Sequence, residues 1–227
     1  FSIGFLVGVC GITNTIFARA FGVPANRESV YISALILALI ITPIGSYHDL
    51  WFLGWSGVWA MASKYMLAIK RKHLFNPATF AVALTALTID QTASWWVGTT
   101  LMLPFVLVGG LLIARKIRRF DLIASFFLAV LATVVLASLL SQESIVTGLR
   151  NTLLYSPLLF FAFTILTEPL TAPPTRGRQI VYGALVGLLF TPQFHIGKLY
   201  ISPEIAILIG NVFAYLVSPK ARLVLQL

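Results

Sequence analysis

The chain is poor in charge. Lys, Arg, Asp and Glu make up 10% of its 227 residues, whereas 59% are hydrophobic. A soluble domain carries about 25% charged residues, so this composition cannot cover a water-facing surface and excludes a soluble globular enzyme. Disorder is excluded as well, because disordered chains combine low hydrophobicity with high charge.

Other absences narrow the chemistry. The single cysteine, Cys10, lies in an apolar run, which excludes an intrachain disulfide and a CxxC metal site. The three histidines show no HxxH spacing, and we expect no metal site. No Walker loop, nucleophile–base pair or pair of carboxylates is present, so nothing in the sequence supports a hydrolase.

What the sequence does contain is long apolar blocks, such as 31–41 and 122–140. Continuous blocks are typical of membrane-spanning helices, whereas a transmembrane barrel shows alternating segments of about ten residues. We therefore expect an all-α polytopic protein in a lipid bilayer. The nine predicted spans are 3–20, 29–43, 50–69, 76–89, 95–114, 121–140, 151–167, 178–191 and 204–217.

The basic residues support this count. When successive span ends alternate between two sides, 13 of the 16 Lys and Arg residues fall on one side, two on the other, and Lys64 within a span. The positive-inside rule makes the basic side cytoplasmic and places the C-terminus there. The net charge of +9 is then an orientation signal, and we expect no nucleic acid partner. For Lys64 we expect a side chain that snorkels to the cytoplasmic surface. The alternative is a cavity-facing partner for a flavin carbonyl or an acid.

Prolines indicate an internal repeat. Pro43 and Pro169 end two spans, Pro77 and Pro203 open two others, and both pairs are 126 residues apart. Five spans per repeat give two copies of opposite orientation, an arrangement that places binding sites where broken helices meet. We expect a first inverted repeat at 1–94 and a second at 95–227, together one membrane domain. The span at 95–114 has no upstream counterpart, so the repeat predicts a further helix before the first residue.

Two segments are candidate binding sites. In the first, Asn76 caps a helix that opens with Pro77 and continues through Thr79. The free N–H groups of such a helix end bind anions. The alternative is an ordinary helix cap behind a basic loop.

The second candidate is the segment TEPLTAPPTRGRQ at 167–179. Non-helical backbone near a membrane packs within protein or lines a cavity. Arg176 and Arg178 lie where the next helix begins, a combination that favours a phosphate group, and Thr171 and Thr175 are candidate hydroxyl donors. The alternative is a cytoplasmic loop that follows the positive-inside rule.

Three stretches resemble the NqrB/RnfD family. They are KHLFNPATF, FTILTEPLTAPPTRGRQIVYGALVGLL and SPEIAILIGNVFAYL, and the resemblance extends over about residues 28–217. Members of this family are flavin-carrying membrane subunits of the sodium-pumping NADH:quinone reductase and of the Rnf complex. The resemblance implies ten helices in two inverted halves, nine of them present here, and electron transfer through a flavin, FMN or riboflavin, held between the halves.

The chain departs from the family pattern at two places. The loop acid, usually Asp, is Glu168 here. The flavin-accepting Ser-Gly-Ala-Thr motif is reduced to VGTT at 97–100, which leaves Thr100 as a candidate attachment point. We therefore expect the flavin to be bound non-covalently.

These observations predict a multi-pass protein of a bacterial cytoplasmic membrane. It relays electrons between a cytoplasmic flavin/NAD(P)H or ferredoxin-type reductase, as a domain or a subunit, and an acceptor in or across the membrane. The chain would also suit the membrane domain of a fusion with a ferredoxin-reductase-like domain. The alternatives are a secondary transporter of a vitamin, ion or organic anion, and a membrane anchor for a reductase domain. No side chain is assigned as catalytic, because the flavin supplies the redox chemistry.

Overall fold

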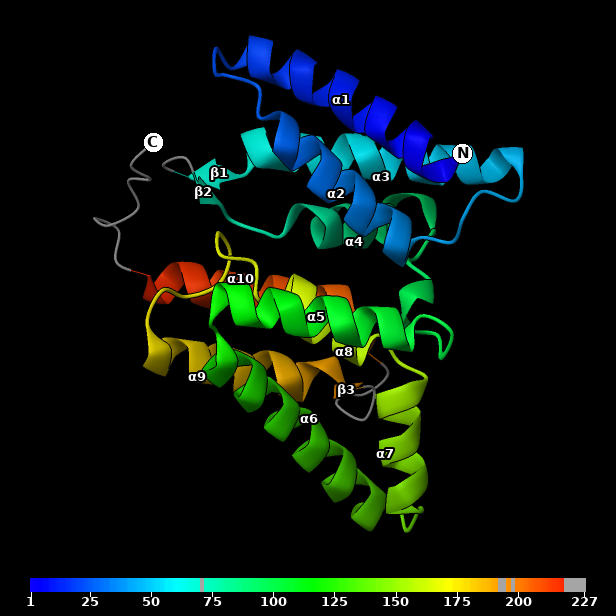
Figure 1. Ribbon diagram of the computed structural model, residues 1–227, viewed down its shortest axis with the longest axis vertical. Coiled ribbons are helices and arrows are strands. Elements are labelled where there is room, and N and C mark those ends of the chain that lie inside the picture. The colour runs from blue at the N-terminus through cyan, green and yellow to red at the C-terminus, as the bar shows by residue number, and fades with distance from the viewer. Residues whose placement is uncertain (70–71, 192–194, 197–198, 219–227) are drawn as a thin grey trace. The chain divides into compact units, whose positions relative to one another are not determined.

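A computed structural model describes residues 1–69, 72–191, 195–196 and 199–218 of the chain. It divides into two compact units, Phe1–Trp96 and Val97–Leu227, which we describe separately (Figure 1). Nearly all regular structure is helical, and the described strands are two residues long. The expected all-α class is confirmed, while the nine-span count and the inverted repeat stay predictions.

The first unit is a four-helix assembly in which α1, α2 and α4 all pack against α3. Polar side chains start the helices: Asn26 caps α2, and Ser46 and Asp49 form a capping box at α3. A small hairpin joins α3 to α4. The elements are α1 (Ser2–Ala20), α2 (Arg27–Ile40), α3 (Tyr47–Met66), β1 (Ala68–Ile69), β2 (Lys72–His73) and α4 (Pro77–Ile89).

The second unit is organised around two helices that lie side by side, α6 and α9 (Figure 1). A short 3-10 turn, η1 (Trp96–Gly98), begins at the last residue of the first unit and ends in the second. Its elements are α5 (Leu103–Ile117), α6 (Phe120–Leu140), α7 (Ile145–Leu154), α8 (Leu158–Phe160), the π-helical turn η2 (Phe161–Ile165), α9 (Arg176–Phe190), β3 (His195–Ile196), β4 (Leu199–Tyr200) and α10 (Pro203–Val217).

The core of this unit is a cluster of aromatic rings. The ring of Phe126 on α6 lies 5.6 Å from that of Phe161 and 5.5 Å from that of Phe190, which are themselves 4.8 Å apart. Each ring is buried. The cluster holds the π-helical turn against α6 and α9, and so positions the segment that follows it.

The same order of elements occurs in both units. In each, a helix is followed by a hairpin with two-residue strands and then by a helix with a proline in its first turn. The elements are α3, β1, β2 and α4 in the first unit, and α9, β3, β4 and α10 in the second. Asn76 and Ser202 are the N-cap residues of the two proline-led helices. The two cap residues are 126 residues apart, the offset seen in the sequence, and the strands of the two hairpins are 127 residues apart.

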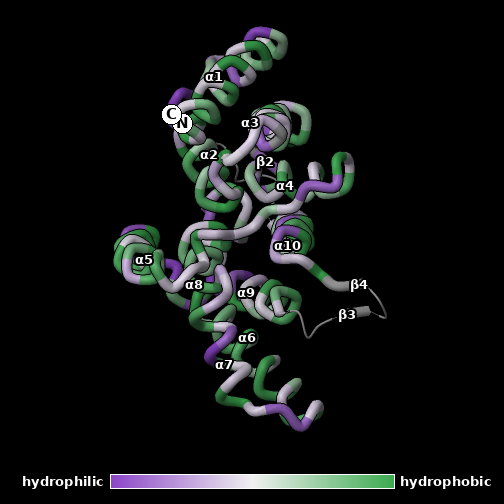
Figure 2. Tube along the Cα trace, turned by 90° about the vertical axis from the view of Figure 1, so that its right-hand side faces the viewer, coloured by the Kyte–Doolittle hydropathy of each residue, from purple (hydrophilic) through white to green (hydrophobic). Residues whose placement is uncertain are grey.

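Two of the described helices, α1 and α6, are long and apolar enough to cross a membrane, and the bent pair of α7 with α8–η2 makes a possible third span. Helices α4 and α10 are apolar but shorter. Hydrophobic residues run along much of α5 and α6 (Figure 2), and several of their leucines, including Leu112 and Leu128, are exposed. Exposed leucines of this kind suit contact with lipid, in agreement with a membrane protein.

Two predicted spans differ from the observed helices. The span at 95–114 becomes a helix only from Leu103, because Trp95 has a left-handed φ of 51° and Pro104 occupies the first helical turn. The span at 151–167 starts earlier, at Ile145, and is broken into two arms that meet at 61°. Pro157 explains the break, since it has no N–H to donate and disfavours helical geometry at the residue before it.

Candidate functional site

The predicted anion site at the start of α4 is a closed helix cap. The Asn76 side-chain oxygen accepts the Thr79 N–H at 3.1 Å, and the Thr79 hydroxyl donates to the Asn76 carbonyl oxygen at 3.2 Å. Both side chains are buried, as is Pro77 in the first turn. The structure thus brings these three residues together, with their polar atoms satisfying the helix end. Residues 70 and 71 of the preceding basic loop lie outside the described residues.

In the second unit, the turn after η2 is held by Glu168. Its backbone oxygen accepts the N–H groups of Thr171 and Ala172 at 3.3 and 3.1 Å, and its carboxylate accepts the Thr171 hydroxyl at 3.0 Å. Thr171 is buried, and Glu168 is half-buried. Because Pro173 and Pro174 follow, the chain cannot continue as a helix. The hydrogen bond from the Thr171 hydroxyl to the Glu168 carboxylate, which was not predicted from the sequence, therefore closes this turn.

The start of α9 carries the remaining predicted residues. Thr175 is the exposed N-cap residue, and its side chain makes no capping hydrogen bond. Arg176 is 78% exposed and forms an ion pair with Asp121, in the first turn of α6, at 2.8 Å. Arg178 is half-buried. Arg176 therefore links α9 to α6 through its ion pair. The Thr175 side chain, which makes no capping bond, and Arg178 lie at the same helix start.

A buried polar cluster near this turn was not foreseen. The Asn211 amide of α10 donates to the hydroxyl of Tyr182 on α9 at 3.1 Å, and both side chains are fully buried. Tyr182 also interacts electrostatically with Glu168 and with Arg119, which precedes α6. The signal in the sequence was the lone Asn in an otherwise apolar stretch, since polar groups inside membrane helices face the protein interior and mark function.

Arg119 is the least satisfied member of this cluster. Its Nη1 atom is buried and has no hydrogen-bond partner within the part of the chain that the structure covers. Burial lowers the pKa of Arg119, and the neighbouring Tyr182 opposes that shift. A buried guanidinium N–H without an acceptor costs free energy, on the order of 1–3 kcal/mol. An anionic or carbonyl group placed there would remove that cost.

The first unit contains a buried cation as well. Lys64 of α3 is 8% exposed, and its Nζ donates to the Ser29 carbonyl at 2.9 Å and to the Ser29 and Ser33 hydroxyls at 2.6 and 2.7 Å. The expectation that Lys64 snorkels to the surface is wrong. Helix α2 packs against α3 and presents the two serines one turn apart, so the ammonium is solvated by protein oxygens.

His73, in the hairpin before α4, lies next to this lysine. Burial is the main reason that its pKa falls to about 4, and the charge of Lys64 lowers it further, while a hydrogen bond with the Lys64 backbone works in the opposite direction. The imidazole is therefore neutral at physiological pH. It adds no positive charge to the basic loop.

Thr100 lies in an exposed turn between η1 and α5. Just before it, Gly98 packs so closely on the backbone of Ser156 and Pro157 that a Cβ atom would lie 2.7 Å from the Pro157 nitrogen. This contact anchors the turn against the break between α7 and α8. The Thr100 side chain itself is accessible to solvent or lipid.

Comparison with known proteins identifies the family. Residues 82–222 match the NQR2, RnfD, RnfE family. This chain belongs to that family. An ion-translocating oxidoreductase complex subunit of Cronobacter sakazakii is 34% identical over 117 residues, which are 51% of this chain and 33% of the relative. The matched part thus spans about a third of that relative's length.

The family match covers one of the two candidate segments and not the other. The Glu168–Arg178 turn, Thr100 and the Arg119–Tyr182–Asn211 cluster all lie within the matched range. The Asn76–Thr79 cap lies before it. Among the residues with described positions, no group of three or more His, Cys, Asp and Glu side chains is arranged to hold a metal ion.

Proposed function

We propose that this chain is a membrane subunit, or the membrane part of a subunit, of an electron-transport oxidoreductase complex. The observation that carries the proposal is membership of the NQR2, RnfD, RnfE family over residues 82–222, together with the similarity to a subunit of an ion-translocating oxidoreductase complex. In this proposal the chain binds a flavin, FMN or riboflavin, and relays electrons between a cytoplasmic reductase domain or subunit and an acceptor in or across the membrane.

The membrane topology is part of the proposal. We infer two inverted halves of a ten-helix fold in a bacterial cytoplasmic membrane, with the C-terminus on the cytoplasmic side. The recurring order of helix, hairpin and proline-led helix supports the repeat, and the one-sided distribution of Lys and Arg supports the orientation. The last nine residues, 219–227, lie outside the described residues.

For the flavin we propose contacts in the second unit. Arg119 has a buried N–H that lacks an acceptor among the described residues, Arg178 is half-buried, and the Thr175 hydroxyl makes no cap bond. Such groups fit a phosphate or a ring carbonyl. Thr171 and Glu168 hold the turn in place, and Asn76 and Thr79 hold α4. A bound flavin supplies the redox chemistry, and nearby cations and hydrogen bonds tune its potential.

The experiment is flavin retention by the full-length protein, purified in detergent from flavin-replete cells. The wild-type protein is expected to be yellow, with flavin absorption bands. Arg119→Gln is expected to bind flavin about tenfold more weakly or worse, since a hydrogen bond from a charged group contributes about 1.5–3 kcal/mol. Arg118→Gln, which changes an exposed neighbour, is the matched control. A colourless wild-type protein would overturn the proposal.

The mode of attachment has its own test. Because the flavin is proposed to be non-covalent, protein run on a denaturing gel should lose its flavin fluorescence. Thr100→Ala should retain the wild-type flavin content before denaturation. Fluorescence that survives the gel in the wild type and disappears in Thr100→Ala would instead establish covalent attachment at Thr100.

A further inference from the structure

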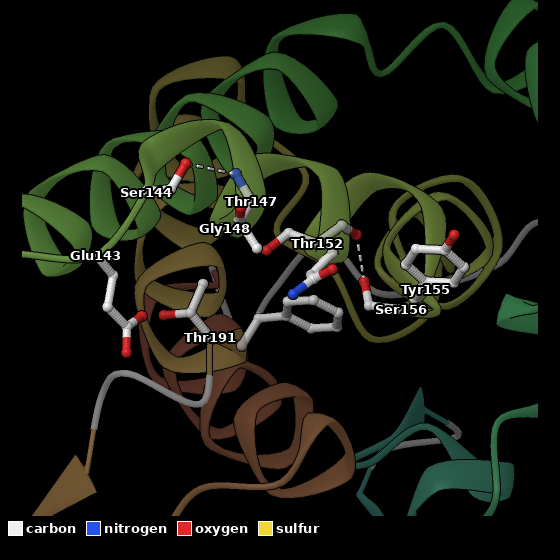
Figure 3. A pocket seen from close by; sticks show the side chains of 10 residues that line it. Glu143, Ser144, Thr147, Gly148, Thr152, Tyr155, Ser156 and Thr191 are labelled. Atoms are coloured by element: carbon white, nitrogen blue, oxygen red, sulfur yellow. Dashed lines mark hydrogen bonds between the residues drawn. The ribbon is translucent and has the colours of Figure 1, made fainter.

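A cavity of about 620 Å³, lined largely by residues that carry hydroxyl, amide or carboxylate groups, lies where α7 meets the end of α9 (Figure 3). Its floor includes Phe190 and Thr191, both buried, and its wall is formed by α7 and the residues on either side of that helix. The volume falls within the range of about 300–1,000 Å³ that is usual for small-molecule sites. All the lining residues belong to the second unit.

Helix α7 turns a polar stripe toward this cavity. Ser144, Thr147, Asn151 and Thr152 recur at helical spacing, and each of them lines the cavity. No residue of α7 is buried, so the stripe is not part of the packed core. A polar stripe on a helix that belongs to a broken membrane span requires polar neighbours, either water or a ligand.

Several lining groups remain able to bind a ligand. The Ser156 and Thr191 hydroxyls donate to backbone oxygens of the helices that precede them, α7 and α9, which leaves lone pairs that can accept. The Ser144 oxygen accepts the Thr147 N–H in a long bond of 3.4 Å, so its hydroxyl proton is available to donate. The cavity thus offers both donors and acceptors.

Among the described residues, the charge of the lining is one-sided. Glu143 supplies a carboxylate, and none of the ten described residues that line the cavity is Lys, Arg or His. The nearest base in the sequence, Arg150, instead donates to the Tyr155 hydroxyl at 3.3 Å and lies over its ring. The carboxylate of Glu143 therefore favours a ligand with a positive group beside it.

The surroundings of the cavity are apolar. It begins just past the end of α6, one of the two described helices with the length and hydropathy of a membrane span. Leu136, Leu139 and Leu140 at that end of α6, and Val146 on α7, are 58–78% exposed. A cavity with polar groups in its lining, beside exposed leucines at the end of a membrane helix, matches an amphiphile whose head enters the cavity while its chains lie along the leucines.

We propose that this cavity binds the headgroup of a phospholipid with a primary amine, the ethanolamine class. Its ammonium lies at Glu143, its phosphate and glycerol oxygens accept from the hydroxyls of Ser144 and Thr147, and its acyl chains run along the exposed end of α6. The proposal is independent of flavin binding, because the cavity shares no residue with the proposed flavin contacts.

The test is thermal unfolding of delipidated full-length protein reconstituted into vesicles of three compositions: phosphatidylcholine alone, or with one fifth phosphatidylethanolamine or phosphatidylglycerol. We expect phosphatidylethanolamine to give the largest rise in Tm. In native mass spectrometry it should be retained about fivefold over phosphatidylglycerol, in keeping with one partly exposed ion pair. Glu143→Gln should remove that preference, and Glu28→Gln, an exposed acid in the first unit, should keep it.

A second variant and a soluble headgroup complete the test. Thr147→Val removes a headgroup contact without changing charge, and serves if Glu143→Gln does not fold; it should weaken retention while the preference over phosphatidylglycerol persists. Soluble glycerophosphoethanolamine should raise the Tm much less than the lipid, because it has no chains. Equal retention of all three lipids, an unchanged preference in Glu143→Gln, or an equal effect of the soluble headgroup would each overturn the proposal.

Discussion

Gly187 of α9 lies directly against the main chain of Phe126 on α6. A Cβ atom at this glycine would be 2.6 Å from the Phe126 carbonyl oxygen and 2.9 Å from the Ala129 Cβ atom. Gly183, one turn earlier, is equally confined by the Leu122 oxygen at 2.5 Å. Small residues at this spacing let two helices approach closely in a membrane, so van der Waals packing and not hydrophobicity holds α6 and α9 together.

The first prediction concerns this contact. Gly187→Ala should destabilise the protein by about 1–3 kcal/mol, because backbone atoms on α6 must move to accept the methyl group. Gly109→Ala, on α5, is the control, since a Cβ atom added there would have no neighbour within 4 Å and alanine favours helix. Thermal unfolding in detergent measures both. Equal stability of the two variants would contradict the close packing of α6 on α9.

The second prediction concerns the buried Tyr182–Asn211 pair. Tyr182→Phe removes the hydroxyl that accepts from the Asn211 amide. An N–H group that loses its acceptor in a buried place costs about 1–3 kcal/mol. Tyr31→Phe, at an exposed tyrosine on α2, should change stability little. In a double-mutant cycle with Asn211→Leu, the second substitution should cost less once the first has been made, and additive losses would rule the coupling out.

The third prediction concerns Lys64. Lys64→Met preserves the length and apolar stem of the side chain but removes the donor to Ser29 and Ser33. The loss of these bonds should cost about 1–3 kcal/mol, and Lys116→Met, at an exposed lysine of α5, should have almost no effect. If Lys64→Met is as stable as the wild type, the ammonium contributes nothing to the packing of α2 on α3.

The fourth prediction concerns pH and His73. Its pKa falls from 6.5 to about 4 in the folded protein, so between these values the unfolded chain binds more protons than the folded one. The stability that the neutral imidazole contributes is therefore complete above pH 6.5 and is lost as the pH falls toward 4. The slope from this one group reaches at most about 1.4 kcal/mol per pH unit.

His73→Gln provides the comparison for that measurement. Unfolding of wild type and variant, followed from pH 7.5 to 4.5, should show a stability difference that shrinks or changes sign toward acid. Carboxylates titrate alike in the two proteins, so their contribution cancels in the difference. A pH-independent difference would show that His73 is not buried in its neutral form.

Much of the helical content follows from local sequence. Asn76 followed by Pro77 predicts the start of α4 to within a residue, because capping and the fixed φ of proline act within one helical turn. The predicted and observed bounds of the spans at 121–140 and 204–217 differ by one residue at most. The break at Pro157 and the late start of α5 were missed, because the predicted spans were drawn across short polar interruptions, YSP at 155–157 and GTT at 98–100.

Some residues of the candidate site were also predicted from the sequence, and others were found only in the structure. The family resemblance and the candidate residues Glu168 and Thr171 came from positions close together in the chain. The polar cluster of Arg119, Tyr182 and Asn211 joins positions up to 92 residues apart, and no periodicity relates them. Whether Arg176 met a ligand or Asp121 depended on where α6 begins relative to α9.

By itself, the sequence indicated a membrane protein, the start of several of its helices, such as α4, and the family to which the chain belongs. Apolar composition, capping and motif spacing act over short stretches of chain and need no partner. The tertiary structure alone decided that Lys64 is buried, that Arg119 lacks an acceptor among the described residues, and that α7 borders a cavity with polar groups in its lining. Each of these depends on which surface another helix presents, and that is a property of packing.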